Sequence, residues 1–179
     1  MKIRTFESKR LCRASAAFRL AWSIAGALLL ASCGPGAADF IPDDYSSWER
    51  INREELDYPI PGHESNYRII YMNETGTGAE GYPFPEGTKI IKEVYSGLDP
   101  AEDEEPFMLT TMVKAPEHES ARGGWLWIIV DGETGDETVI TEAFCLTCHD
   151  NANEEHPYAD KNPTGEFRDY VYFVPGYAE

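Results

Sequence analysis

The sequence predicts a mainly β protein of the α+β class, built as one antiparallel β-sheet with a few short helices. Two observations carry this prediction. Stretches rich in β-branched and aromatic residues recur along the chain, and passages rich in Gly, Pro and Asp separate them. The segment 125–130 is apolar on both faces, which places it centrally in the sheet. No internal repeat or second-domain linker is apparent, so one folded domain is expected.

The elements are expected in the following order. A short helical stretch at 43–50 begins after Asp and Ser capping residues. Strands are expected at 66–72, 88–95, 107–114, 125–130 and 170–174. The turn signal Asp131-Gly132 follows the fourth strand. A short helix is expected within 142–153.

The most informative stretch is Cys145-Leu146-Thr147-Cys148-His149. Two thiols three positions apart, followed at once by an imidazole, form the attachment pattern of a c-type haem. Each thiol can add to one haem vinyl group, and His149 is then the axial ligand of the iron. The pattern therefore predicts one covalently attached haem c, packed by the sheet and the short helices.

The same spacing has other uses. Two cysteines in this pattern also form redox dithiols, zinc sites and structural disulfides. His156 is close enough in sequence to complete a zinc site, although the chain lacks the second Cys or His pair that most such sites use. Zinc and redox chemistry remain alternatives to haem.

The N-terminus predicts export. Residues 1–19 are basic and residues 20–31 are apolar but too short to span a membrane, as in a signal peptide. Leu30-Ala31-Ser32-Cys33 resembles the lipobox of bacterial lipoproteins, so we expect a signal peptide at 1–32, lipidation of Cys33 and a tether at 33–41. Ordinary cleavage near Ala37 or Ala38 is the alternative. The haem domain is then 42–179, facing the periplasm from a bacterial membrane, the outer membrane being favoured.

The mature chain is strongly acidic. The full sequence carries a net charge of -17, and six basic residues against one acidic residue precede Cys33, which leaves -22 for the remainder. This sign excludes nucleic acid as a partner and limits membrane contact to the lipid anchor. It is compatible with a basic redox partner, although acidic runs of this kind are more often solvated loops.

One lysine stands out in the predicted strand at 88–95. Strand alternation places Lys92 between Ile90 and Val94 on one apolar face. A lysine in that position must reach water, find a partner or lose its proton. From the residues alone, a lysine that extends to solvent beside a carboxylate is the simpler interpretation.

Several motifs, in order, resemble the cytochrome P-460 and cytochrome c′-beta family of periplasmic haem proteins over most of residues 40–179. The matching motifs are Tyr67-Arg68-Ile69-Ile70-Tyr71, Phe84-Pro85-Glu86-Gly87-Thr88 with Lys92-Glu93, Met112-Val113-Lys114, and Gly124-Trp125 before the haem pentapeptide. The resemblance implies a mainly antiparallel sheet with a few helices, which agrees with the strands derived above.

The resemblance also implies roles for three residues. In the P-460 branch a lysine at the position of Lys92 bonds to the haem, so Lys92 is expected beside the cofactor as a candidate cross-link. Arg68 matches an arginine expected near the propionates or the distal side, with a surface ion pair as its alternative. Hydroxylamine-oxidising members carry an acidic residue where Thr110 stands, and a hydroxyl is a poor base. That oxidation would then need Glu104 or Glu105 to fold in.

Taken together, the sequence predicts an exported mono-haem cytochrome with His-ligated, five-coordinate iron that binds or transforms small nitrogen species such as NO or hydroxylamine. An electron-transfer cytochrome or a gas binder without catalysis is the alternative. A second copy of the chain, in a homodimer, is a further candidate partner. Phe84, Phe107 and Met108 are expected to crowd the distal side. His63, His118 and His156 are expected at the surface, and Met72, Met108 and Met112 in the core.

Overall fold

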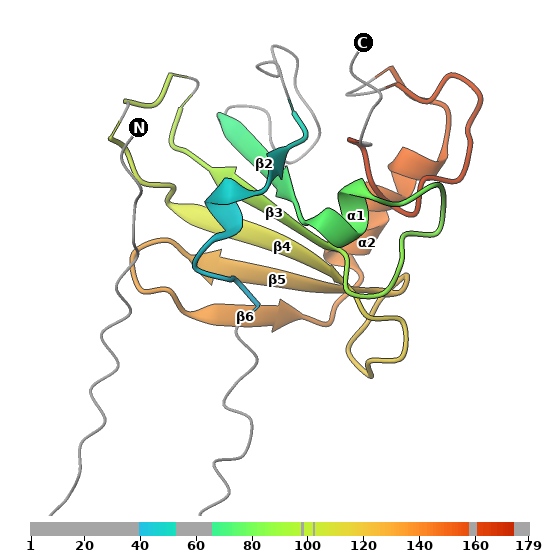
Figure 1. Cartoon of the computed structure of the whole chain (residues 1–179), viewed down its shortest axis with the longest axis horizontal. Coiled ribbons are helices and arrows are strands. Elements are labelled where there is room, and N and C mark those ends of the chain that lie inside the picture. Colours follow the sequence, from blue (N-terminus) through green and yellow to red (C-terminus); the bar gives the residue numbers. More distant parts are fainter. Residues whose placement is uncertain (1–39, 53–65, 98, 102, 158–160, 174–179) are drawn as a thin grey trace, which may run out of the picture. The chain divides into compact units, whose positions relative to one another are not determined.

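The computed structural model describes residues 40–52, 66–97, 99–101, 103–157 and 161–173. These residues form one six-stranded antiparallel sheet in the order β1-β2-β3-β4-β5-β6, with β2 to β6 side by side in Figure 1. The strands are β1 (Glu49–Arg50), β2 (Arg68–Met72), β3 (Lys89–Val94), β4 (Met108–Lys114), β5 (Trp125–Asp131) and β6 (Glu137–Ile140). Each strand pairs with its sequence neighbour, as in a meander.

The helices are short. Two are α-helices, α1 (Glu74–Thr77) and α2 (Phe144–His149), and two are 3-10 helices, η1 (Tyr45–Ser47) and η2 (Asp150–Asn153). The side chain of Asn73 caps α1 by accepting a hydrogen bond from Gly76 N. Asp131 closes the turn between β5 and β6 by accepting from the backbone N–H groups of Glu133 and Thr134. None of the described helices is long and apolar enough to cross a bilayer.

The register divides the sheet into two faces. Opposed residues in antiparallel strands point to the same side, so Ile70, Lys92, Thr110 and Ile129 form one row across β2 to β5. The larger apolar cluster lies on this face, together with Cys145 and Leu146 of α2; its buried members are Ile51, Ile70, Met72, Phe84, Ile90, Met112, Trp125, Trp127 and Val171. We call it the α2 face.

The opposite face has a separate core. Val113, Leu126, Ile128 and Val130 are buried there, and Phe40 and Ile41 pack against them. Buried Glu93 lies on this side and accepts hydrogen bonds of 2.9 Å from the hydroxyls of Tyr45 and Tyr95. We call it the Phe40 face. The buried apolar side chains of this face pack against one another.

Four of the five predicted strands are confirmed, three of them with slightly shorter bounds and β5 with one more residue at its end. The strand predicted at 170–174 is wrong over its described residues, 170–173, because φ is +52° at Asp169 and +69° at Tyr170, which turns the chain out of an extended path. Residue 174 lies outside the described residues. The strand β6 was missed because its four residues carry little apolar alternation.

The predicted helix at 43–50 reduces to η1, followed by β1. The side chain of Asp44 makes no cap bond there, and Trp48 already has extended backbone angles. The predicted helix for the haem pentapeptide is confirmed as α2. The predicted signal peptide, and Cys33 with it, lies outside the described residues.

Candidate functional site

The helix α2 gathers the residues of the predicted haem pentapeptide. Cys145, Cys148 and His149 are three and four positions apart, which puts their side chains on one side of the helix. Both thiols are free, Cys145 half-buried and Cys148 exposed. Burial raises the pKa of the Cys145 thiol, the nearby Lys92 ammonium opposes that shift, and the protonated form is retained at neutral pH.

The imidazole of His149 is held from three directions. Its Nδ1 lies 2.9 Å from the backbone oxygen of Tyr170, and the rings of Trp127 and Tyr172 pack at centroid distances of 4.8 and 5.7 Å. A carbonyl only accepts, so Nδ1 carries the proton and Nε2 has the lone pair. Desolvation, reinforced by the charge of Lys92, lowers the pKa of His149 to about 4 against the opposing hydrogen bond to Tyr170. A neutral imidazole with a fixed tautomer is the form that binds metals.

These groups line a cavity of about 290 Å³ between the α2 face of the sheet and the segment around α2. The cavity residues include Arg68, Ile70, Ile90, Lys92, Val94, Met108, Thr110, Met112, Trp127 and Ile129 from the sheet, with Cys145, Cys148, His149, Val171 and Tyr172 opposite them. Most of this lining is apolar. The structure thus brings together the cysteines, the histidine, Lys92, Arg68 and Thr110, which the sequence places up to 81 residues apart.

Lys92 projects into this cavity from the middle of β3. Desolvation, with a smaller effect from the Arg68 guanidinium, lowers the pKa of Lys92 to about 7, and the Cys145 sulfur acts in the opposite sense. The expected position on the apolar α2 face is therefore confirmed. At neutral pH a large fraction of the amine is therefore deprotonated, which is the form that acts as a nucleophile or a ligand.

Arg68 and Thr110 flank Lys92 on the neighbouring strands. Arg68 is buried and donates from Nε to the backbone oxygen of Asn66, so it is not a surface arginine. Thr110 lies directly opposite Lys92 in the β3 to β4 register. Among the described residues that line the cavity, none is Asp or Glu. Glu104 accepts from Ser96 Oγ and Ala101 N on an exposed loop instead.

Of the three residues expected to crowd the distal side, one lines the cavity. Met108 lines the cavity. Phe84 does not, because it is buried against Trp125 in the core, with ring centroids 6.0 Å apart. Phe107 does not either, since it is half-exposed at the start of β4.

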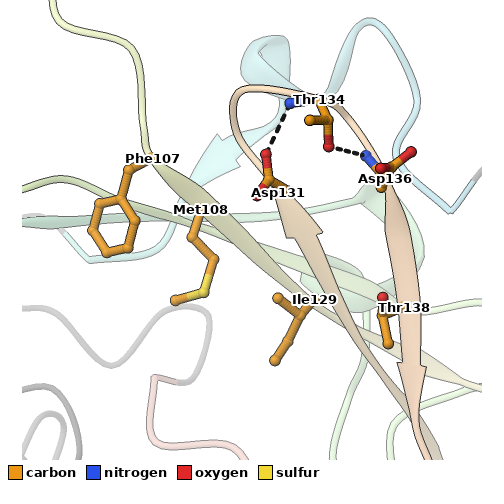
Figure 2. A pocket seen from close by; sticks show the side chains of 7 residues that line it. All are labelled: Phe107, Met108, Ile129, Asp131, Thr134, Asp136 and Thr138. Carbon is orange, nitrogen blue, oxygen red and sulfur yellow. Dashed lines mark hydrogen bonds between the residues drawn. The ribbon is translucent and has the colours of Figure 1, made fainter.

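A second hollow, of about 590 Å³, adjoins the first and is wide open. Figure 2 shows Met108 and Ile129 on its floor and the aspartates Asp131 and Asp136 at the turn. Asp131 is fully exposed, and its hydrogen bonds from the N–H groups of Thr134 and Glu133 lower the pKa of its carboxyl. Volume alone would favour this hollow. The enclosed cavity is the better site because it holds the thiols, the imidazole and the amine.

Of the other histidines that the structure describes, His118 and His156, neither lines the cavity. His118 is exposed and accepts from Ser120 N, as expected for a surface residue. His156 is buried, contrary to the prediction, because its ring packs 5.1 Å from Tyr172. His63 lies outside the described residues. No three His, Cys, Asp or Glu side chains are placed together so as to hold a metal ion in the part of the chain that the structure describes.

Sequence reasoning missed the C-terminal segment. Tyr170 supplies the carbonyl for His149, and Asp169 forms an ion pair with Lys114 at 2.7 Å. Both were read as part of, or next to, a strand. The sequence holds no local signal for these contacts, because residues 21 and 55 positions apart meet in them.

Comparison with known families decides the identity. The model of the family described as cytochrome P460 matches residues 42–173, most of the chain. The chain belongs to the cytochrome P460 family. The resemblance predicted from the motifs is confirmed, and so is the mainly β fold with a six-stranded antiparallel sheet. No curated protein matches the chain.

Membership of the cytochrome P460 family implies haem binding, and the residues present fit that group. The cavity is apolar, as a porphyrin requires, and the imidazole on its wall is neutral and fixed in one tautomer. Two thiols on the same helix lie at its edge. This donor set suits iron in a haem.

Proposed function

We propose that the chain is a mono-haem c-type cytochrome that binds small nitrogen species, NO in particular, at an open iron position. In this proposal Cys145 and Cys148 would attach the haem and His149 Nε2 would bind its iron. The observation that carries it is the fixed, neutral imidazole of His149 on the wall of an apolar cavity that both thiols share. When bound, the haem supplies an iron that can change oxidation state and take a sixth ligand.

The attachment chemistry is balanced without an oxidant. Each thiol adds across one vinyl double bond: a sulfur–carbon bond forms, and the hydrogen of the thiol ends on the neighbouring carbon. Half-buried Cys145 and exposed Cys148 differ in access, so Cys148 is the easier of the two to reach from solvent. His149, as the next residue in α2, is brought to the iron by the same attachment.

The cavity favours binding over hydroxylamine oxidation. Oxidation of hydroxylamine releases protons, which a nearby carboxylate would accept. The polar cavity residues on the sheet side include Thr110, Lys92 and Arg68, and none of the described cavity residues carries a carboxylate. Arg68 and protonated Lys92 can donate hydrogen bonds to an anionic or polar ligand, whereas neutral Lys92 can accept a proton.

The optical spectrum and intact mass of protein matured in the periplasm test this proposal. We expect one covalently bound haem, retained under denaturing conditions, and a high-spin reduced spectrum that changes on addition of NO. Cys145→Ala with Cys148→Ala should abolish covalent haem, whereas Thr147→Ala on the exposed side of α2 should retain it. A low-spin spectrum with both axial positions filled and no response to NO would contradict the proposal. A broad, red-shifted Soret band would indicate a bond to Lys92.

An electron-transfer cytochrome is the second candidate. Phe144, next to the pentapeptide, is 73% exposed and lines the cavity, so it offers an apolar contact at the edge of the site. The acidic chain would then attract a basic redox partner. Electron exchange with a basic partner that slows steeply with added salt, in a protein that does not bind NO, would favour this candidate.

Export and lipid anchoring belong to the same proposal. The basic and apolar N-terminal segments and the Leu30-Ala31-Ser32-Cys33 sequence support a signal peptide and acylation of Cys33, with the haem domain facing the periplasm. The mass of detergent-extracted protein should show a mature N-terminus at Cys33 carrying acyl chains. Cys33→Ala should release the domain from the membrane fraction, and unchanged membrane association would contradict the lipid anchor.

A further inference from the structure

We propose that Asp169, anchored by Lys114 and Trp125, is a positioning residue that fixes the His149 imidazole through the carbonyl of Tyr170. This inference rests on the proposed role of His149 as iron ligand. It assigns a purpose to Lys114, Gly124 and Trp125, residues of the family motifs that do not line the cavity.

The backbone of residues 169 and 170 has an unusual conformation. Both have positive φ, +52° at Asp169 and +69° at Tyr170. Residues with side chains rarely adopt these angles, and two in succession need surrounding contacts to hold them. The result of this conformation is that the oxygen of Tyr170 meets Nδ1 of His149 at 2.9 Å.

A set of hydrogen bonds holds Asp169. Its carboxylate receives Lys114 Nζ at 2.7 Å on both oxygens and the backbone N–H of Phe84 at 2.8 Å. Trp125 Nε1 donates to the backbone oxygen of Asp169 at 3.0 Å and lies 3.3 Å from Oδ1. Asp169 is 1% exposed and Trp125 is fully buried, so water does not compete for these bonds.

The ammonium of Lys114 packs against Trp125 and close to Gly124. Its Nζ lies 4.9 Å from the centroid of the Trp125 ring, over its face. Gly124 has a φ of +81°, and a Cβ on it would come within 3.1 Å of Lys114 Nζ. The absence of a side chain at Gly124 therefore admits the ammonium.

A second set of hydrogen bonds holds the turn from the side of α2, where the haem is proposed to attach. Asn153, in the 3-10 helix that follows α2, accepts from the backbone N–H groups of Arg168 and Tyr170 at 2.9 and 3.1 Å. The turn is thus held by the sheet through Asp169 and by the haem-binding segment through Asn153. The two sets of bonds meet at the peptide group between Asp169 and Tyr170, where Trp125 binds the oxygen of Asp169 and Asn153 binds the N–H of Tyr170.

The consequence for the iron ligand follows from the hydrogen bond. An Nδ1–H that donates to a carbonyl makes the imidazole a stronger electron donor, which favours ferric over ferrous iron. Loss of the turn should weaken this bond. The ferric to ferrous equilibrium should then shift tenfold or more toward ferrous iron, a rise in midpoint potential of about 59 mV for a one-electron couple.

The test is Asp169→Asn in the periplasmically matured holoprotein, with the midpoint potential and the Fe–His stretch of the ferrous form as readouts. We expect a higher potential and a lower stretching frequency at unchanged haem content. Glu93→Gln is the matched control, because it alters a buried carboxylate of the Phe40 face that does not contact the turn. It should lower stability and leave both readouts unchanged.

A second pair covers the case in which Asp169→Asn does not fold. Asn153→Ala removes the hydrogen bonds from the side of α2 and should lower the Fe–His stretch, whereas Asn153→Asp keeps both acceptor contacts and should preserve it. A wild-type stretch and potential in holoprotein of Asp169→Asn or Asn153→Ala would overturn the inference and leave the haem assignment intact. Wild-type protein without covalent haem would overturn both.

Discussion

Two lysines of the α2 face experience opposite surroundings. Lys114, at the end of β4, forms a buried ion pair with Asp169 at 2.7 Å and packs against the Trp125 ring. Lys92, in the middle of β3, projects into an apolar cavity, where desolvation and the Arg68 guanidinium lower its pKa to about 7. The same side chain on the same face is therefore a structural cation in one place and a chemically available amine in the other.

The surroundings of Lys114 stabilise the fold, whereas those of Lys92 prepare a side chain for chemistry. A buried charge with a hydrogen-bonded partner of opposite sign is costly to disturb. A lysine desolvated beside another cation loses its proton readily, and such perturbed groups cluster at functional sites. Three changes would break or sharpen this contrast.

The largest effect is expected at the Lys114 end. Asp169→Asn leaves a buried ammonium without its carboxylate and should reduce the free energy of unfolding by about 3–5 kcal/mol. Adding Lys114→Met removes that charge and should recover a substantial part of the loss. Urea unfolding of the three proteins measures both quantities. A double variant no more stable than Asp169→Asn would show that the ion pair is not the source of the effect.

The next effect concerns Lys92 and pH. Its folded pKa is lowered from 10.5 to about 7, so between these values the unfolded chain binds a proton that the folded chain does not. The free energy of unfolding of the haem-free protein should therefore rise with pH from about 7 to 10.5. Below pH 7 Lys92 is protonated in the folded state, and the loss of stability from burying its charge is complete. The slope is at most about 1.4 kcal/mol per pH unit, and less where water enters the cavity.

Lys92→Met removes this titrating group and provides the reference. As pH rises through that window, the free energy of unfolding of the wild-type protein should increase relative to that of the variant. Urea unfolding curves taken at each pH measure this difference. A constant difference between the two proteins from pH 7 to 10.5 would mean that Lys92 keeps an ordinary pKa.

The smallest effect is expected from Thr110→Glu. Thr110 lies directly opposite Lys92 in the register, so a carboxylate there should give Lys92 surroundings like those of Lys114. An opposite charge at that range should raise the pKa of Lys92 by at least about one unit. The pH dependence of amine labelling at Lys92, followed by mass spectrometry, measures it. Thr138→Glu is the control, since Thr138 is exposed on β6 and lines the other hollow. An equal shift in both variants would reject a local interaction.

Some of the site could be predicted from sequence, and the physical reason is locality. The pentapeptide at 145–149 forms one helical turn, so its spacing alone places both thiols and His149 together. Strand alternation put Lys92 on the apolar face because period two needs no knowledge of neighbouring strands. Family motifs then joined the Lys92 segment to the haem pentapeptide, and the family match confirms that membership.

Other features depended on contacts between distant residues. The burial of His156 and the removal of Phe84 and Phe107 from the cavity are set by packing that no local pattern records. The segment at 170–173 reads as a strand because its residues have high β-propensity, yet the bonds to Asp169 and Asn153 hold a turn with positive φ.

By itself, the sequence determined the class of fold, the helical turn that carries Cys145, Cys148 and His149, and the face that Lys92 occupies, since each follows from spacing along a helix or a strand. The tertiary structure alone decided that Lys114 meets Asp169 and that Tyr170 holds His149. These pairs lie 55 and 21 positions apart in the chain, and only the folded structure brings them within hydrogen-bonding distance.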